Sequence, residues 1–174
     1  MASTAALPSM EQLDQLDQAG FRAAVGPLFE DAPSYLALLA AQRPFDSWDT
    51  LFERAEATAL AAAEPVQLEL LAAHPRIGAP PGTVSSLSWR EQGYDREQQE
   101  AISTLGPLND AYEARFGFRY VIFVAGRSRS AVVPLLEQAL GRDREAEKAR
   151  GLRDVVAIAR ARAATLGMRE GGTR

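Results

Sequence analysis

Residues 118–126, FRYVIFVAG, decide the fold of this chain, because they are its one stretch with strand-like content. A single strand has no partner with which to pair its backbone N–H and C=O groups. The rest of the sequence has the periodicity of helices. We therefore expect an all-α protein, a single-domain helical bundle in which this stretch forms one extended, buried connector.

Helix-end signals divide the remaining chain into short helices. Ser9 followed by Gln12 has the pattern of a capping box, and Gly20 is a stop signal for this first helix. Apolar residues at helical spacing continue in the segments after it. The other helices are expected in these ranges: 21–28, 31–43, 46–64, 65–74, 130–140 and 143–166.

Glycine and proline mark two interruptions in the second half of the chain. Residues 75–87 are rich in Gly, Pro and Ser, which predicts a loop. Asp95 can cap a helix that continues to Phe116, and Gly106-Pro107 is expected to kink or break that helix.

Length and composition predict one globular domain without a metal site. A chain of 174 residues is long enough for one core and too short to expect two, so residues 1–174 are expected to form a single domain. Because the chain has no cysteine, disulfides, thiolate nucleophiles and zinc–thiolate sites are excluded. It has one histidine and no carboxylates at calcium- or zinc-type spacing, so no metal ligands are expected.

Charge and hydropathy exclude two kinds of partner. The net charge of −4 argues against nucleic-acid binding, which needs a clustered basic face. Basic residues over 142–153 alternate with acids, a pattern typical of a solvated helix face. No stretch approaches ~18 consecutive apolar residues, and the N-terminus lacks the pattern of a signal peptide. We expect a cytoplasmic protein that binds neither nucleic acid nor membrane.

The one histidine, His74, stands at the end of a predicted apolar helix. It follows Leu70 and Leu71 by four and three residues and therefore shares their face of the helix. A lone histidine there is either a satisfied core residue or a catalyst. Pro75 ends the helix and opens a loop, where a side chain can meet a pocket.

Two further positions carry polar groups with competing interpretations. Ser88 and Glu91 form a capping-box pattern, which alone would explain both residues. Arg162 falls within the apolar stripe of the last helix, where a charge must be paired or must face an anion. The alternatives for Arg162 are an internal salt bridge or a side chain that extends to solvent.

Four stretches in order resemble the 2-oxo-4-hydroxy-4-carboxy-5-ureidoimidazoline (OHCU) decarboxylase family. They are AHPRIG at 73–78, SWREQ at 88–92, LNDAYEARFGFRYVIFVAG at 108–126 and VVAIARARAATL at 155–166. The stretch at 21–51 is also similar, so the resemblance covers a core of about 9–167.

The resemblance implies an all-α homodimer that needs no cofactor or metal. Its small-molecule substrate would be a ureidoimidazoline, decarboxylated to (S)-allantoin in urate degradation. The catalytic residues would be His74 as proton donor, Glu91, and Arg162 facing the anion. The implied substrate-binding residues are Pro75, Ser88 and Gln92, with the backbone of Tyr120, Val121, Ile122, Phe123 and Val124.

Two other functions stay open on the sequence alone. One is a non-catalytic helical interaction module in which His74 is a core residue. The other is an acid–base lyase or hydrolase that acts on a different ureido compound.

Overall fold

A computed structural model describes residues 7–79 and 99–168 of the chain. Among these residues there is no β-strand, and most of them lie in helices, so the predicted all-α class is confirmed. The chain divides into two compact units, one of Met1–Leu70 with Val156–Arg174 and one of Leu71–Val155.

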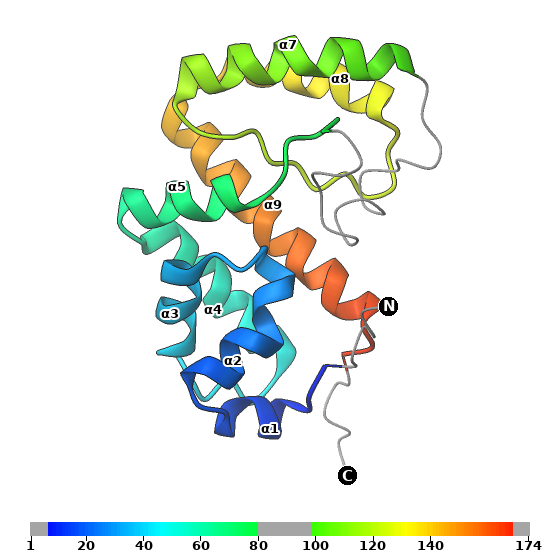
Figure 1. The fold of residues 1–174 in the computed structure, drawn as a ribbon. Coiled ribbons are helices and arrows are strands. Elements are labelled where there is room, and N and C mark those ends of the chain that lie inside the picture. Colours follow the sequence, from blue (N-terminus) through cyan, green and yellow to red (C-terminus); the bar gives the residue numbers. More distant parts are fainter. Residues whose placement is uncertain (1–6, 80–98, 169–174) are drawn as a thin grey trace. The chain divides into compact units, whose positions relative to one another are not determined.

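The first unit is built from short helices that pack on their sequence neighbours (Figure 1). Its core consists of apolar side chains such as Phe21, Phe29, Leu36 and Phe52, each at most 2% exposed. Its helices are α1 (Met10–Gln15), α2 (Gln18–Val25), the 3-10 helix η1 (Gly26–Phe29), α3 (Pro33–Ala40) and α4 (Trp48–Ala61), with the first part of α5 (Glu64–Ala73) and the last part of α9 (Arg144–Thr165).

The expected stop at Gly20 is wrong, whereas the capping box at Ser9 is confirmed. Helix α1 ends earlier, at Gln15, and Gly20 lies inside α2. The side chain of Asp17 accepts a hydrogen bond from the Gly20 amide at 2.7 Å, so it caps a new helix. A cap residue therefore outweighed the weak helix-breaking tendency of one glycine.

Helix α3 begins without a side-chain cap from the residue that precedes it, Ala32. Pro33 stands in its first turn, where its missing N–H needs no partner. Glu69 of α5 supplies the cap instead, because its carboxylate accepts from the Ser34 amide at 2.7 Å and from the Ser34 hydroxyl at 2.6 Å. The helix ends before Pro44, as predicted.

The second unit contains α7 (Gln99–Phe116), α8 (Arg129–Ala139) and the first part of α9. Helices α7 and α8 lie side by side (Figure 1). Helix α7 continues through Gly106-Pro107, so the expectation of a break there is wrong. Proline inside a helix costs about 3 kcal/mol, and the burial of Leu105, Tyr112 and Phe116 along α7 offsets that cost.

The segment between α7 and α8 is the extended connector expected from FRYVIFVAG. Residues 119–124 have no regular secondary structure, and Tyr120, Val121 and Val124 are at most 4% exposed. Tyr112 of α7 packs against Tyr120 with ring centroids 5.0 Å apart. The prediction of a buried, extended connector is therefore confirmed.

Candidate active site

His74 lies directly after the last residue of α5 and is 3% exposed. Its backbone N–H donates to Leu71 O at 3.3 Å, which closes the last turn. The Arg119 guanidinium donates from Nη1 to the carbonyls of Ala72, at 2.7 Å, and His74, at 2.6 Å. A cation on the last carbonyls of a helix complements their partial negative charge, so Arg119 fixes the backbone that carries the histidine.

Helix α7 holds the segment that follows His74. The Asn109 side chain, 1% exposed, donates to Ile77 O at 3.0 Å. Arg76 forms ion pairs with Asp110 at 2.8 Å and with Glu113 at 2.6 Å. The path of this segment is therefore determined by α7 as well as by its own proline and glycine.

A cavity of about 420 Å³ opens beside this segment. Its described lining mixes apolar groups with an amide and two guanidinium groups. The lining residues are Pro75, Arg76, Ile77, Gly78, Ala79, Gly106, Asn109 and Arg119. Pro75 is the one predicted substrate-binding residue among them.

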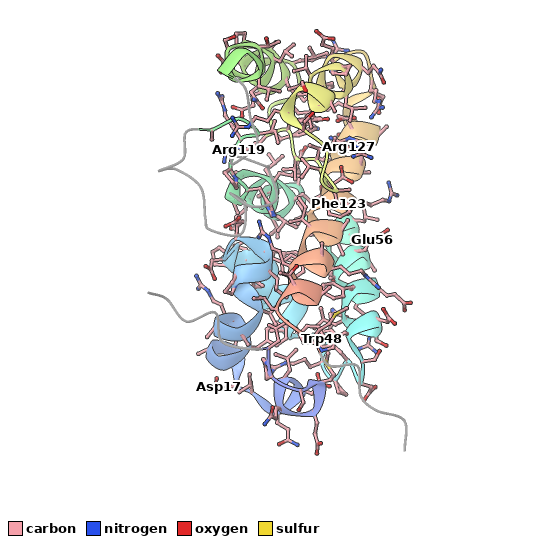
Figure 2. The ribbon with its side chains drawn as sticks, turned by 90° about the vertical axis from the view of Figure 1, so that its right-hand side faces the viewer. Asp17, Trp48, Glu56, Arg119, Phe123 and Arg127 are labelled. Carbon is pink, nitrogen blue, oxygen red and sulfur yellow. The ribbon has the colours of Figure 1, made fainter. Side chains whose placement is uncertain are left out.

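The predicted backbone site at 120–124 is held by α9. The Arg150 guanidinium donates to Val121 O at 3.0 Å and stacks on the Tyr120 ring, 4.9 Å from its centroid. Figure 2 labels Arg119 at the start of this connector, Phe123 near its end and Arg127 just beyond its end. Arg127 donates to Phe123 O at 3.2 Å.

A buried acid lies behind this backbone. Glu147 is 0% exposed and accepts hydrogen bonds from Arg150 Nε at 2.7 Å and from the Tyr112 hydroxyl at 3.1 Å. Burial, then the Glu147 charge, raises the pKa of Tyr112, so its phenol stays protonated as a donor. The solvated face expected for this part of α9 is therefore wrong for Glu147, and also for Lys148, which is 7% exposed.

Arg162, in the other unit, is 2% exposed and has internal partners. Its Nη2 lies 2.8 Å from Glu30 Oε1, and its Nη1 donates to the carbonyls of Pro27 at 3.2 Å and Leu28 at 3.1 Å. These carbonyls belong to the end of η1, where a cation is favoured. The prediction that Arg162 is buried is confirmed, and the internal salt bridge weighed as its alternative is present.

Three predicted residues, Ser88, Glu91 and Gln92, lie outside the described residues. Within the described residues, no group of three His, Asp or Glu side chains is arranged to hold a metal ion. Over the same residues, no helix is long and apolar enough to cross a membrane.

The sequence did not single out Arg119 or Arg150. Arg150 stands in a run of alternating charges, and nothing in that run marks which residues face a neighbouring segment. Arg119 lies within the strand-like stretch, where its charge was the one available signal.

Comparison with known proteins identifies the family. The sequence profile of OHCU decarboxylase matches residues 14–164. A 2-oxo-4-hydroxy-4-carboxy-5-ureidoimidazoline decarboxylase of Halalkalicoccus jeotgali is 31% identical over 95% of this chain and 96% of its own length. The uric acid degradation bifunctional protein PucL of Bacillus subtilis is also 31% identical over 95% of this chain, which spans about a third (34%) of that longer protein.

A solved structure shares the fold. The crystal structure of OHCU decarboxylase in the presence of (S)-allantoin matches 87% of this chain and 98% of its own, with a TM-score of 0.67 and 18% sequence identity. At this identity the likeness concerns the fold alone, and it agrees with the match of the profile to most of the sequence. On these grounds the chain belongs to the OHCU decarboxylase family.

Proposed function

We propose that this protein decarboxylates 2-oxo-4-hydroxy-4-carboxy-5-ureidoimidazoline to (S)-allantoin, a step of urate degradation. The observation that carries the proposal is the family match over residues 14–164, which includes the one histidine of the chain. The curated relatives carry this substrate or uric acid degradation in their names.

The chemistry of this substrate needs no electron sink beyond its own ring. The bond between the ring carbon and the carboxylate breaks, CO2 leaves, and the electron pair moves toward the neighbouring C=N bond. The ring carbon that carries the ureido group then takes up one proton. The enzyme has to orient the carboxylate perpendicular to the ring, stabilise the developing charge and deliver that proton to one face.

His74 is the proposed proton donor, without a cofactor. An imidazole with an ordinary pKa near ~6.5 can release a proton near neutral pH. His74 is buried, and two hydrogen bonds from Arg119 hold the backbone around it, which suits a group that must protonate one face. Glu91 is proposed to orient or charge His74, or to bind the substrate hydroxyl.

The remaining proposed contacts divide between polar side chains and backbone. Gln92 can donate to and accept from a ureido group, and Ser88 and Pro75 are proposed beside it. The backbone of the connector residues Tyr120, Val121, Ile122, Phe123 and Val124 is proposed to hold the planar ring. Arg162 is proposed to face the substrate carboxylate while keeping Glu30 as its internal partner.

Two statements about the whole protein belong to the same proposal. By resemblance to the family we propose a homodimer that works in the cytoplasm. Sedimentation of the purified protein, which distinguishes a monomer from a dimer, tests the first, and fractionation of the source cells tests the second.

A chiral assay tests the proposed reaction. Freshly generated OHCU is mixed with the protein, and circular dichroism follows the allantoin that forms. We expect fast appearance of the (S) enantiomer. Slow, racemic allantoin, as without protein, would instead support the non-catalytic interaction module. Turnover of a different ureido compound but not of OHCU would support the alternative lyase or hydrolase.

A further inference from the structure

Asn109 of α7 connects that helix to the segment that follows His74. Its side-chain nitrogen Nδ2 donates to Ile77 O at 3.0 Å and to Leu105 O at 2.7 Å, and the residue is 1% exposed. A primary amide nitrogen carries two hydrogens, so each carbonyl can accept one of them. Leu105 belongs to the same helix, whereas Ile77 lies 32 residues earlier in the chain. One buried amide group therefore attaches the segment to α7.

The two partners of this amide determine its orientation. Both are carbonyl oxygens, which only accept hydrogen bonds, so the nitrogen and not the oxygen of the Asn109 side chain must face them. The side-chain oxygen Oδ1 is buried and accepts no hydrogen bond in the described part of the chain. A buried acceptor without a donor costs stability. The side chain therefore adds little to stability as a whole, and its specific effect is to hold Ile77 O in place.

Close packing at Gly78 brings the same segment against α7. Gly78 has a φ of +81°, which favours glycine, and a Cβ there would lie 3.1 Å from Cδ1 and 3.2 Å from Cβ of Leu105. Ile77, beside it, is 5% exposed. Leu105 and Asn109 stand four residues apart and share one face of α7. The segment is thus packed on one turn of that helix, and the amide of Asn109 holds it there.

The stretch from His74 to Ile77 is held at both ends. Arg119 donates to His74 O at 2.6 Å, and Asn109 donates to Ile77 O at 3.0 Å. Between these two carbonyls Pro75 has a fixed φ, which removes one of the few backbone rotations left. The bond that carries the imidazole of His74 takes its direction from this backbone. That direction is therefore fully defined only while both carbonyls are held.

We infer that Asn109 is a positioning residue, which holds Ile77 O and thereby directs the imidazole of His74 toward the substrate. This role rests on the proposed function for its reaction, whereas the effect of Asn109 on the position of His74 does not depend on it. Asn109, Ile77 and Pro75 all line the cavity beside the segment, so the contact lies at the wall of the candidate site.

Two substitutions of Asn109 test this role by kinetics. Asn109→Leu has a similar size and removes the donor. Asn109→Ser keeps a hydroxyl that can donate to Leu105 O, four residues earlier, and is too short to replace the bond to Ile77 O. We expect kcat for OHCU to fall on the order of tenfold in both. The fall in kcat should exceed any rise in KM, because a proton donor acts in the transition state. The serine variant carries the test if the leucine variant does not fold.

The NMR signals of His74 report its position directly. The chain has one histidine, so the two carbon-bound protons of its imidazole are identified without ambiguity in protein that carries no histidine tag. We expect both signals to shift in Asn109→Leu and in Asn109→Ser, because the ring then meets different neighbours. This measurement needs neither substrate nor turnover.

Gln67 of α5 provides a matched control. It is 7% exposed, and its Nε2 also donates to two carbonyls, those of Ala59 and Leu60, at 3.0 Å each. Neither carbonyl belongs to the segment after His74. Gln67→Met has a similar size and removes the donor, so it should lower the melting temperature and leave both kcat and the His74 signals unchanged.

Three results would overturn the inference. The first is a folded Asn109 variant with the kcat of the unsubstituted protein, and the second is one whose His74 signals do not shift. The third is a loss of kcat in Gln67→Met as large as in the Asn109 variants, which would mark a general structural effect. Failure of the proposed function looks different: the unsubstituted protein would not convert OHCU, while the His74 signals would still decide whether Asn109 positions the imidazole.

Discussion

Arg119 Nη1 lies 2.6 Å from the carbonyl oxygen of His74. The same nitrogen donates to Ala72 O at 2.7 Å, so one cation binds two of the last carbonyls of α5. Arg119 reaches them from the connector, 45 residues further along the chain. The backbone of the proposed proton donor is thus fixed by a long-range contact and not by its own helix alone.

Replacing Arg119 tests this contact. Arg119→Met keeps the apolar stem of the side chain and loses both hydrogen bonds. We expect the free energy of unfolding to fall by about 1 kcal/mol, a small loss for hydrogen bonds from a charged group because this guanidinium is partly exposed to solvent. Because His74 loses its fixed backbone, kcat should fall on the order of tenfold. Urea unfolding and steady-state kinetics measure the two effects. Arg115→Met, which removes an exposed arginine of α7, is the control and should change neither.

His74→Asn tests the proton donor itself. Asparagine can place a polar group near the position of one ring nitrogen of His74, a residue that is 3% exposed. We therefore expect the variant to fold, with an unchanged far-UV circular dichroism spectrum. Turnover should fall by about 10²–10⁴-fold, the usual contribution of a general acid. A variant with near-normal kcat would return His74 to the role of a core residue.

The sequence predicted the helices well because their signals are local. The capping box of Ser9 with Gln12 acts within a few residues and needs no knowledge of the rest of the chain. The strand-like stretch at 118–126 was predicted to be a connector because the sequence contains no second stretch of this kind with which it could pair. Gly20 and Gly106-Pro107 were exceptions. At Gly20 two local signals competed and the cap at Asp17 prevailed, and Gly106-Pro107 lies inside the continuous helix α7.

The contacts that hold the candidate site in place could not be predicted, because they join residues that are far apart in the sequence. Glu147 stands among alternating charges typical of solvent-exposed helices, yet it is fully buried beneath Arg150 and Tyr112. Only the packing of α7 and the connector against α9 distinguishes it from its exposed neighbour Glu145. Arg162 was identified as buried from its periodicity, but its partner Glu30 lies 132 residues away.

Chelation tests the proposal that no metal takes part. Activity on OHCU should be unchanged after exhaustive dialysis against EDTA, because the proposed proton transfer and charge stabilisation use side chains and backbone groups alone. The same dialysed sample, assayed again with added divalent ions, is the control. Loss of activity that a divalent ion restores would contradict the proposal.

Tyr120 should make stability depend on alkaline pH. Burial raises the pKa of Tyr120 from 10.0 to about 12. Below about pH 10 the phenol is protonated in both states, whereas between 10 and 12 only the unfolded chain ionises, so stability falls as pH rises. Tyr120→Phe, which keeps the ring beneath Arg150, should reduce this fall by up to about 1.4 kcal/mol per pH unit. Urea unfolding at several pH values above 9 measures the slope, and equal slopes in both proteins would contradict the assignment.

Substitutions in the ion pair of Arg162 and Glu30 can separate the role of Arg162 in stability from its proposed role in substrate binding. Arg162→Lys keeps the charge and loses the planar fork that reaches Glu30 and the carbonyls of Pro27 and Leu28 together. We expect the free energy of unfolding to fall by about 2 kcal/mol, as for lost hydrogen bonds to a charged group. Arg160→Lys is the control, because Arg160 pairs with Asp49 on the exposed surface of the same helix.

Glu30→Gln decides whether Arg162 also binds the substrate. Glutamine keeps an acceptor near Arg162 Nη2 and removes the negative charge that partly neutralises this buried guanidinium. If Arg162 faces the substrate carboxylate, the less neutralised cation should attract that carboxylate more strongly, because a buried charge seeks compensation. We therefore expect KM for OHCU to fall in Glu30→Gln and to rise in Arg162→Lys, while the melting temperature drops in both. If both variants lose stability and keep the kinetics of the unsubstituted protein, the salt bridge is the whole role of Arg162 and its proposed contact with the substrate is wrong.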